Sequence, residues 1–542
     1  MASSSSSAAT APDNGLRKTA PAASEREISA FDAVEDDTDL YHGHLRSTHK
    51  DDGFTKTDAR DMQRMGKAQE LRRNFRLLST IAFTVILQGT WEVLLTATYQ
   101  GLFWSYIWTF IGFSFVMASL AEMASMAPTA GGQYHWVSEF APPRWQKSLS
   151  YVTGWMSTLS WQAGTASGPY LVGTMIQSMI YVNDPDYSGT NWQGTLFVIA
   201  ITIVVYGMNV YGARAMPVFQ NLMLILHVLG FVTIVVCFWV LAPRNTAATV
   251  FTQFTNDGGW NSMGLALMVG QISAIYACIC SDAAAHMSEE IKDAGRTVPK
   301  AMVGSYLLNG ALGLVFLITY LFCITDLEGA LNDDTGYPHL FVFRNAFSLP
   351  ATNTLSAIVI ILIYAGTLSY NISTSRQTWS FARDGGLPWS DWIAKVNPKL
   401  EVPANAVLVT CAFTVLLSLI NIGSDAAFNA IISLNVVSLM ITYMTSIGCV
   451  LYRRIYHPEL LPPARWSLGR WGVAVNTVGV LYSTHAFFWC FWPNYTPTDA
   501  PGFNWASVMF VAVLLFCAID YMLRAKKVYK GPVVLVEGWR GE

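Results

Sequence analysis

Charged residues are scarce in this sequence. Aspartate, glutamate, lysine and arginine make up only 13% of its 542 residues, whereas hydrophobic residues make up 52% and tryptophan occurs 19 times. A soluble domain usually contains about 25% charged residues. The composition therefore argues against an ordinary soluble protein and indicates a membrane protein.

Sequence signatures of catalysis are missing as well. The chain contains no GxxxxGK[ST] nucleotide-binding loop and no HExxH motif, and its nine histidines are scattered. Asp282 and His286 lie four residues apart, on one face of a predicted helix, and such a pair could in principle carry acid–base chemistry. Metal enzymes need several ligands gathered together, so the pattern disfavours an enzyme. We expect no metal, no cofactor and no nucleic-acid partner.

A secretory leader and a disulfide framework are also absent. No long apolar run precedes Leu77, so we expect no signal peptide and a cytosolic N-terminus. All eight cysteines fall inside apolar segments, where small packing residues are the simplest interpretation.

Long apolar runs, by contrast, are abundant. About 20 apolar residues cross a bilayer, and twelve stretches of roughly this length carry few or no charges. We therefore expect an all-α multi-pass membrane protein with twelve transmembrane helices in the lipid bilayer. The predicted spans lie near residues 77–97, 103–127, 150–182, 192–211, 217–241, 264–287, 301–324, 354–381, 404–422, 426–451, 471–492 and 505–524.

The distribution of basic residues predicts the orientation. With the N-terminus inside, the non-cytosolic connections hold only Arg244 and Arg344, and the other loop lysines and arginines are cytosolic. Because these residues resist translocation, both termini are predicted to be cytosolic. Residues 1–70 lack an apolar period and predict a disordered cytosolic tail, residues 71–525 form the membrane domain, and residues 526–542 form a short cytosolic tail.

Two carboxylates interrupt the predicted spans. Glu92 follows Gly89 and Thr90 in the first span, and Asp282 follows Ser281 in the sixth. A charge at the bilayer centre costs about 2.5–3.5 kcal/mol on insertion scales, so such residues usually face a cavity or a partner. Transporters built from two five-helix inverted repeats break the first helix of each repeat, and the spacing matches that arrangement. An interhelical packing role is the alternative for each carboxylate.

Three ordered segments carry a family resemblance. Residues 280–302 (CSDAAAHMSEEIKDAGRTVPKAM) resemble the sixth span and following loop of amino acid/polyamine/organocation (APC) permeases. Residues 119–143 (SLAEMASMAPTAGGQYHWVSEFAPP) and 375–388 (SRQTWSFARDGGLP) agree. The likeness runs from about Leu77 to Leu523 and is strongest to the fungal branch that carries amino acids, γ-aminobutyrate or choline.

The resemblance implies a secondary transporter with a 5+5 inverted-repeat core and broken helices 1 and 6. Its solute would lie between the two breaks, flanked by spans three and eight. Carried onto this chain, the substrate-binding residues would be Gly89, Thr90, Trp91, Glu92, Cys278, Ser281 and Asp282, with Tyr276 as an aromatic gate. Further candidates, each more often a packing residue, are Trp155, Trp161, Tyr364, Tyr370 and Asn371.

The sequence of the first break favours a cationic solute. Many amino-acid permeases have a glycine-rich stretch there whose amides take the substrate carboxylate, whereas this chain reads QGTWE with one glycine. An indole face attracts ammonium groups and a carboxylate neutralises them, so Trp91 beside Glu92 suits an amine. We predict import of an amino acid, γ-aminobutyrate or choline by alternating access. An uncoupled facilitator and a non-transporting nutrient sensor on the same fold stay open.

Proton coupling is the predicted driving force, because fungal members of the resembling family generally use protons. His227, Glu92 and Asp282 are the candidate proton carriers. A neutral His227 bound to a neighbouring carbonyl is the alternative for that residue. The plasma membrane is the family's commonest location, a vacuolar membrane is the alternative, and the oligomeric state is left open.

The cytosolic end of span six carries a predicted inner gate. Glu289 and Glu290 lie there, and Arg376 and Arg383 near the inner end of span eight are suitable partners. An ion pair that exists only while the gate is shut would bias alternating access.

Overall fold

The computed structural model describes residues 55–96, 102–254, 256, 258–422, 427–493, 495–499, 502–529 and 531–532. Most of the predicted N-terminal tail, residues 1–54, and residues 533–542 of the predicted C-terminal tail lie outside this part. The described residues form helices, and the β-structure among them is limited to two isolated bridges.

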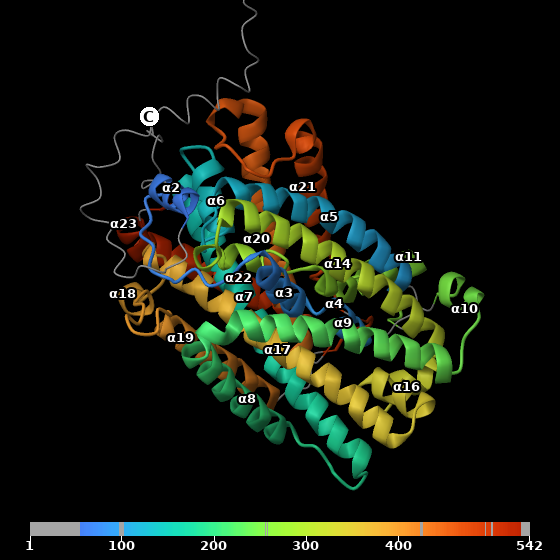
Figure 1. Cartoon of the computed structure of the whole chain (residues 1–542). Coiled ribbons are helices and arrows are strands. Elements are labelled where there is room, and N and C mark those ends of the chain that lie inside the picture. The colour runs from blue at the N-terminus through green and yellow to red at the C-terminus, as the bar shows by residue number, and fades with distance from the viewer. Residues whose placement is uncertain are drawn as a thin grey trace, which may run out of the picture. The chain divides into compact units, whose positions relative to one another are not determined.

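Helices lie within each of the twelve ranges predicted to span the membrane (Figure 1). They are α3 (Leu77–Gln88), α4 (Thr90–Thr96), α5 (Leu102–Met126), α7 (Gln146–Asn183), α8 (Asn191–Tyr211), α9 (Met216–Leu241), α11 (Met263–Gly270), α12 (Ile272–Cys278), α13 (Ala283–His286), α14 (Ala294–Cys323), α17 (Leu349–Arg383), α19 (Ala404–Ser418), α20 (Ala427–Tyr456), α21 (Gly472–Trp489) and α22 (Ala506–Asp520). The helices outside those ranges are α2 (Lys56–Arg64), α6 (Gln133–Phe140), α10 (Ala247–Thr252), α15 (Leu327–Leu331), α16 (Pro338–Ala346), α18 (Ser390–Ile393) and α23 (Lys526–Val528).

Nine helical segments of the described chain are long and apolar enough to cross a bilayer. The other three predicted spans correspond to α7, α19 and α21, of which α19 has only 15 residues. The long α7 is rich in serine, threonine and glycine, which lowers its hydropathy. The fold is thus that of an all-α multi-pass membrane protein, while the count of twelve remains a prediction.

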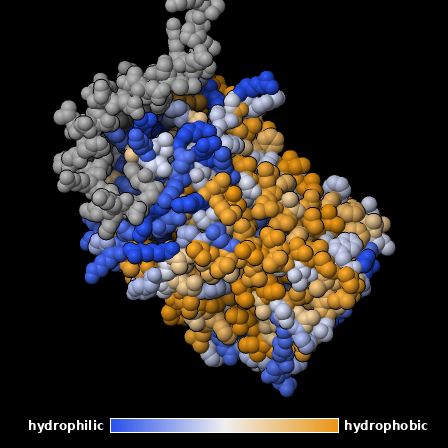
Figure 2. All heavy atoms as spheres, in the orientation of Figure 1, coloured by the Kyte–Doolittle hydropathy of each residue, from blue (hydrophilic) through white to orange (hydrophobic). Residues whose placement is uncertain are grey.

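The long helices run between two ends of the helical bundle, with α2, α6 and α18 near one end and α10 and α16 near the other (Figure 1). Figure 2 shows a broad hydrophobic surface over the middle of the helices, and hydrophilic residues gathered toward the end with α2. Large apolar side chains such as Ile203, Leu222 and Val511 are exposed. Exposed apolar side chains on this scale fit a lipid-facing surface.

The first span is interrupted where the sequence predicted it. α3 ends at Gln88, and Gly89 adopts a left-handed conformation with φ 49° and ψ 44° before α4 begins at Thr90. This conformation is open to glycine because it has no Cβ. The single glycine of QGTWE thus changes the direction of the chain at mid-span.

The sixth span is interrupted over residues 279–282. α12 ends at Cys278, Ile279 is extended, and Cys280 has φ 72° before α13 begins at Ala283. A left-handed cysteine is uncommon, and such conformations persist only where the surroundings hold them. Both predicted helix breaks are confirmed, and the strained residue of the second is Cys280.

The prediction that residues 1–70 are disordered is wrong for residues 56–64, which form α2. Thr55 caps this helix, and its side chain and that of Asp58 form a reciprocal capping box. The T-x-x-D pattern is a known helix-start signal, so the sequence did carry this information. The short length of the helix and its lack of an apolar run hid it.

Candidate functional site

A cavity lies where the two helix breaks meet α7 and α17. Its empty volume, which includes the open solvent at its mouth, is about 610 Å³. Most of its wall is apolar or glycine. The lining residues are Ile86, Leu87, Gln88, Gly89, Glu92, Val93, Gly164, Ser167, Gly168, Leu171, Tyr276, Ile279, Cys280, Leu362, Ile363, Gly366, Thr367 and Tyr370.

Glu92 is the one carboxylate among these lining residues of the described chain, and lysine, arginine and histidine do not occur among them. Its Oε1 atom lies 2.7 Å from Nδ1 of His227, a fully buried residue of α9. Its Oε2 atom has no hydrogen-bond partner among the described residues. One carboxylate oxygen is therefore held by the protein, and the other has capacity left for a ligand.

The same ring nitrogen is approached by a second group. Nε1 of Trp91 lies 3.2 Å from Nδ1 of His227, positioned to donate to it. A nitrogen that carries a proton for Glu92 cannot also accept from the indole. Trp91 can therefore donate a hydrogen bond to Nδ1 of His227 only when that nitrogen carries no proton.

Trp91, predicted to bind substrate, faces away from the cavity. Its side chain is fully buried, with ring centroids 5.3 Å from Phe316 and 6.2 Å from Phe231. Because α4 turns about 100° per residue, Glu92 and its neighbour Trp91 point in different directions. Trp91 is thus not among the residues that line this cavity, and its indole contacts His227 instead, so its cation–π role stays a prediction.

Asp282, predicted to bind substrate, also lies outside the cavity lining. It is fully buried and accepts hydrogen bonds from Gln133 of α6 and Tyr443 of α20, each at 2.5 Å. These bonds join the second break to two other elements. The packing alternative weighed for this carboxylate agrees with its contacts.

Of the other residues predicted to bind substrate at the two breaks, some line the cavity and others lie outside its lining. Gly89 and Tyr276 line the cavity. Thr90 instead donates to the carbonyl of Ala277 at 2.9 Å, and Ser281 donates to Gln88 at 3.0 Å. Cys278 lies in the buried core outside the lining. Thr90 and Ser281 therefore connect the two breaks, whereas Cys278 packs in the core.

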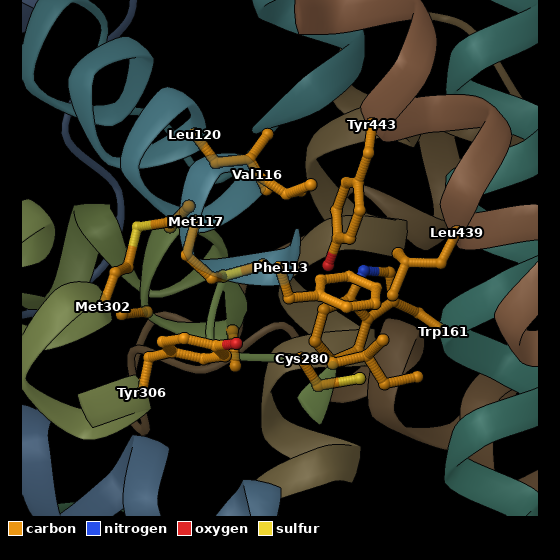
Figure 3. Packing of buried hydrophobic residues seen from close by; sticks show 14 of the residues in the cluster. Phe113, Val116, Met117, Leu120, Trp161, Cys280, Met302, Tyr306, Leu439 and Tyr443 are labelled. Atoms are coloured by element: carbon orange, nitrogen blue, oxygen red, sulfur yellow. The ribbon is translucent and has the colours of Figure 1, made fainter. Parts of the chain in front are cut away.

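Four aromatic or amide candidates from α7 and α17 lie behind the cavity wall. Trp161 belongs to the buried cluster around Cys280 and Tyr443 (Figure 3), and its ring is 5.2 Å from that of Tyr370. Trp155 packs on Phe516, 5.2 Å between centroids. Tyr364 contacts the sulfur of Met208 at 3.2 Å, and Asn371 accepts from Asn209 at 2.8 Å.

Tyr370 does line the cavity. Its hydroxyl lies 2.8 Å from Sγ of Cys280, so it connects α17 to the second break. On the facing side, the Tyr276 hydroxyl lies 2.8 Å from Oγ of Ser167 on α7. These contacts place two phenol rings in the wall of the cavity that holds Glu92.

Several lining residues were missed by the sequence reasoning. Gln88, Ser167 and Thr367 supply polar groups, while Gly164, Gly168 and Gly366 let helices approach closely. The small-residue pattern Gly164–Ser167–Gly168 on α7 was a usable signal. It was overlooked because apolar runs identify spans but not which face of each span points inward.

The predicted gate residues form two ion pairs at the end of the helices near α2. Nε of Arg376 lies 2.6 Å from Glu290, and Arg383 donates to both oxygens of Glu289 at 2.7 and 2.9 Å. Burial alone would raise the pKa of Glu289, but Arg383, Lys67 and the backbone amide of Ala130 together outweigh burial and lower that pKa below its usual value. The second pair is therefore ionised throughout the physiological pH range.

No group of three or more histidine, cysteine, aspartate or glutamate side chains that could hold a metal ion occurs among the residues with described positions.

Comparison with known proteins identifies the family. The profile of the amino acid permease family matches residues 75–515, which include both helix breaks, α7 and α17. The chain belongs to the amino acid permease family. It is a membrane transporter and not an enzyme. The resemblance predicted from three sequence motifs is thereby confirmed.

Named relatives of this permease are transporters. A protein of Macrophomina phaseolina named as an amino acid/polyamine transporter is 31% identical over 413 residues, covering 74% of this chain and 90% of the relative. The choline transporter of Saccharomyces cerevisiae is 28% identical over 416 residues, covering 76% and 72%. A solved manganese transporter of Eremococcus coleocola aligns with a TM-score of 0.49 and 12% identity, over 86% of this chain and 94% of that one.

Substitution of Gly366 tests how tightly α17 packs on the first break. A Cβ at this position would lie 2.9 Å from the carbonyl oxygen of Ile86, which is backbone and cannot move easily. We expect Gly366→Ala to destabilise the permease by about 1–3 kcal/mol. The measurement is the thermal unfolding midpoint of the purified protein in detergent.

Gly448→Ala on α20 is the matched control, because a Cβ there would meet no atom within 4 Å. The control should unfold at the wild-type temperature or slightly above it, since helical glycine costs about 0.5–1 kcal/mol relative to alanine. Equal midpoints for the two variants would contradict the close approach of α17 to the break.

Proposed function

We propose that this permease imports a small amine-bearing solute by proton-coupled alternating access, and that the solute binds between the two helix breaks. The observation that carries the proposal is Glu92, the single carboxylate in the cavity wall, with one oxygen on His227 and the other without a protein partner. A buried charge needs a partner, and a cationic solute supplies one.

The cavity chemistry favours a solute whose charge is an ammonium group. Glu92 neutralises a cation, and the rings of Tyr276 and Tyr370 offer aromatic faces for it. A substrate carboxylate would find only neutral groups in the wall, such as Gln88 and Thr367. The choline transporter among the relatives supports the same reading. We therefore rank choline above γ-aminobutyrate and neutral amino acids.

A competition screen in proteoliposomes tests this ranking. Labelled choline uptake is measured against unlabelled choline, γ-aminobutyrate, and neutral and basic amino acids. We expect choline to compete strongly and neutral amino acids to compete weakly, because only their amine ends are matched by the wall. Absence of specific uptake of labelled choline, or inhibition of that uptake by neutral amino acids as strong as by unlabelled choline, would contradict the ranking.

The Glu92–His227 pair is the proposed site of proton coupling. The pair is buried, and protonation at either group changes the contact with Trp91 on α4. A proton on His227 leaves Glu92 ionised, so the pair can hold a proton and a solute cation at the same time. We assign the proton to His227 and the solute cation to Glu92, whereas the contacts of Asp282 leave it a packing role.

Two variants separate these roles. We expect Glu92→Gln to reduce uptake at least about tenfold, since a buried charge-assisted contact contributes about 1.5–3 kcal/mol. We expect His227→Gln to bind solute but to lose the dependence of uptake on external pH. Binding to purified protein and uptake between pH 5 and 8 are the measurements.

Glu401→Gln serves as control, because Glu401 pairs only loosely with Arg214 on the surface, at 3.9 Å. It should behave as wild type in both assays. If Glu92→Gln retains wild-type affinity and pH dependence, Glu92 is a packing residue and the proposed site is wrong.

The two ion pairs near α2 are the proposed inner gate. They join the loop after α13 to α17, which would have to separate for the cavity to open on that side. The basic loops on that side predict that it is cytosolic. With both pairs formed, the structure corresponds to a closed inner gate in this scheme.

Glu290→Gln tests the gate. The variant keeps the shape of the side chain but removes the charge that faces Arg376 at 2.6 Å. We expect faster solute exchange and weaker concentrative uptake, because the closed state loses stability relative to the open state. Unchanged exchange and uptake in proteoliposomes would remove this pair from the gate.

A further inference from the structure

A segment before the first span is tied to both sides of the proposed inner gate. This latch segment, residues 55–75, consists of α2 and the extended chain that follows it. On one side, the amide of Phe75 donates to the carbonyl of Glu290 at 3.0 Å, and Gln69 donates to the carbonyl of Glu289 at 2.7 Å. The segment therefore holds the backbone of both gate glutamates.

On the other side, the latch segment is bound to the end of α17. Lys67 forms a buried ion pair with Asp384, the residue after Arg383 of the gate. Burial alone would raise the pKa of Asp384, but Lys67 and Arg383, with a smaller effect of His135, together outweigh burial and lower that pKa below its usual value. Removing one partner of a buried ion pair leaves the other charge uncompensated, so loss of either Lys67 or Asp384 would strongly destabilise this contact region.

α2 anchors the segment firmly at a third point. Asp58 accepts from the backbone amides of Asp293 and Ala294, both at 3.0 Å, and so caps the first turn of α14. Arg73 of the same segment lies 3.2 Å from Asp58. A carboxylate at a helix N-terminus satisfies otherwise unpaired amides and the helix dipole.

The far end of α2 has its own contacts. Arg64 pairs with Glu139 of α6 at 2.6 Å and donates to the carbonyl of Met126 at 2.7 Å, while Asp61 pairs with Arg465. The latch segment thus bridges α6, the loop between α13 and α14, α17 and the loop after α20. Four elements that precede or follow different spans are joined by one short piece of chain.

We propose that residues 55–75 act as a latch that holds the inner gate shut, and that the Lys67–Asp384 contact must break before the cavity opens to the cytosol. The latch rests on the proposed transport function and adds to it a control element outside the spans. In this proposal the contacts of the latch form only while the inner gate is closed. Each contact therefore favours the closed state over the open state by the free energy that it contributes.

Accessibility of Cys280 provides a test that needs no substrate. Cys280 lines the cavity and is only 3% exposed while the gate is closed. Inside-out membrane vesicles are treated with a membrane-impermeant maleimide, and labelling at Cys280 is quantified by peptide mass spectrometry. We expect Lys67→Ala and Asp58→Ala each to raise labelling at Cys280 about fivefold or more, the low end of typical coupling between sites.

Three controls keep the result interpretable. Lys56→Ala removes an exposed lysine of α2 for which no ion pair occurs in the described structure, and it should label as wild type. Lys67→Arg keeps the charge and should label close to wild type. The buried Cys323, outside the cavity lining, is the internal reference, and its labelling should stay constant in folded variants.

Wild-type labelling in both Lys67→Ala and Asp58→Ala, with unchanged Cys323 and monodisperse protein, would overturn the latch. Increased labelling in right-side-out vesicles alone would also overturn it, because the opening would then be on the other side. Loss of solute uptake in wild type would refute the proposed function without affecting this readout, so the two failures are distinguishable.

Discussion

The architecture of the site follows from breaking two helices inside a bilayer. Hydrocarbon offers no hydrogen bonds, so the backbone groups freed at Gly89 and at residues 279–282 need partners within the protein. Thr90 binds the carbonyl of Ala277, and Asn309 binds that of Val85. These hydrogen bonds connect the two breaks to each other and to α14. The cavity is the space that remains between the breaks, α7 and α17.

Glu92 adds the second constraint. A carboxylate at this depth is unfavourable without a partner, and His227 satisfies only one of its oxygens. Side chains that complete a packed core are normally satisfied in full, as Asp282 is by Gln133 and Tyr443. The contrast between these two buried carboxylates is the reason for assigning Asp282 to packing and for proposing Glu92 as the partner of a solute or a proton.

The helices and the two breaks could be predicted from the sequence, because each is encoded by residues close together in the chain. The apolar runs indicated the helices, Gly89 and Ser281 indicated the breaks, and the charges of Glu289 and Arg383 indicated their pairing. The face of each helix could not be predicted, since it depends on tertiary contacts. Trp91 was predicted to face the solute but lies outside the cavity lining, whereas Tyr370 lines the cavity. The role proposed for α2 could not be predicted either, because it rests on contacts with elements that are distant in the sequence.

The central claim is that solute and proton share the Glu92–His227 site. The most direct measurement is the internal pH of proteoliposomes, followed with a trapped dye while choline is added outside in the absence of any other ion gradient. The account predicts that solute entry acidifies the interior in wild-type vesicles and that empty vesicles show no change. Choline uptake with no movement of protons would contradict it.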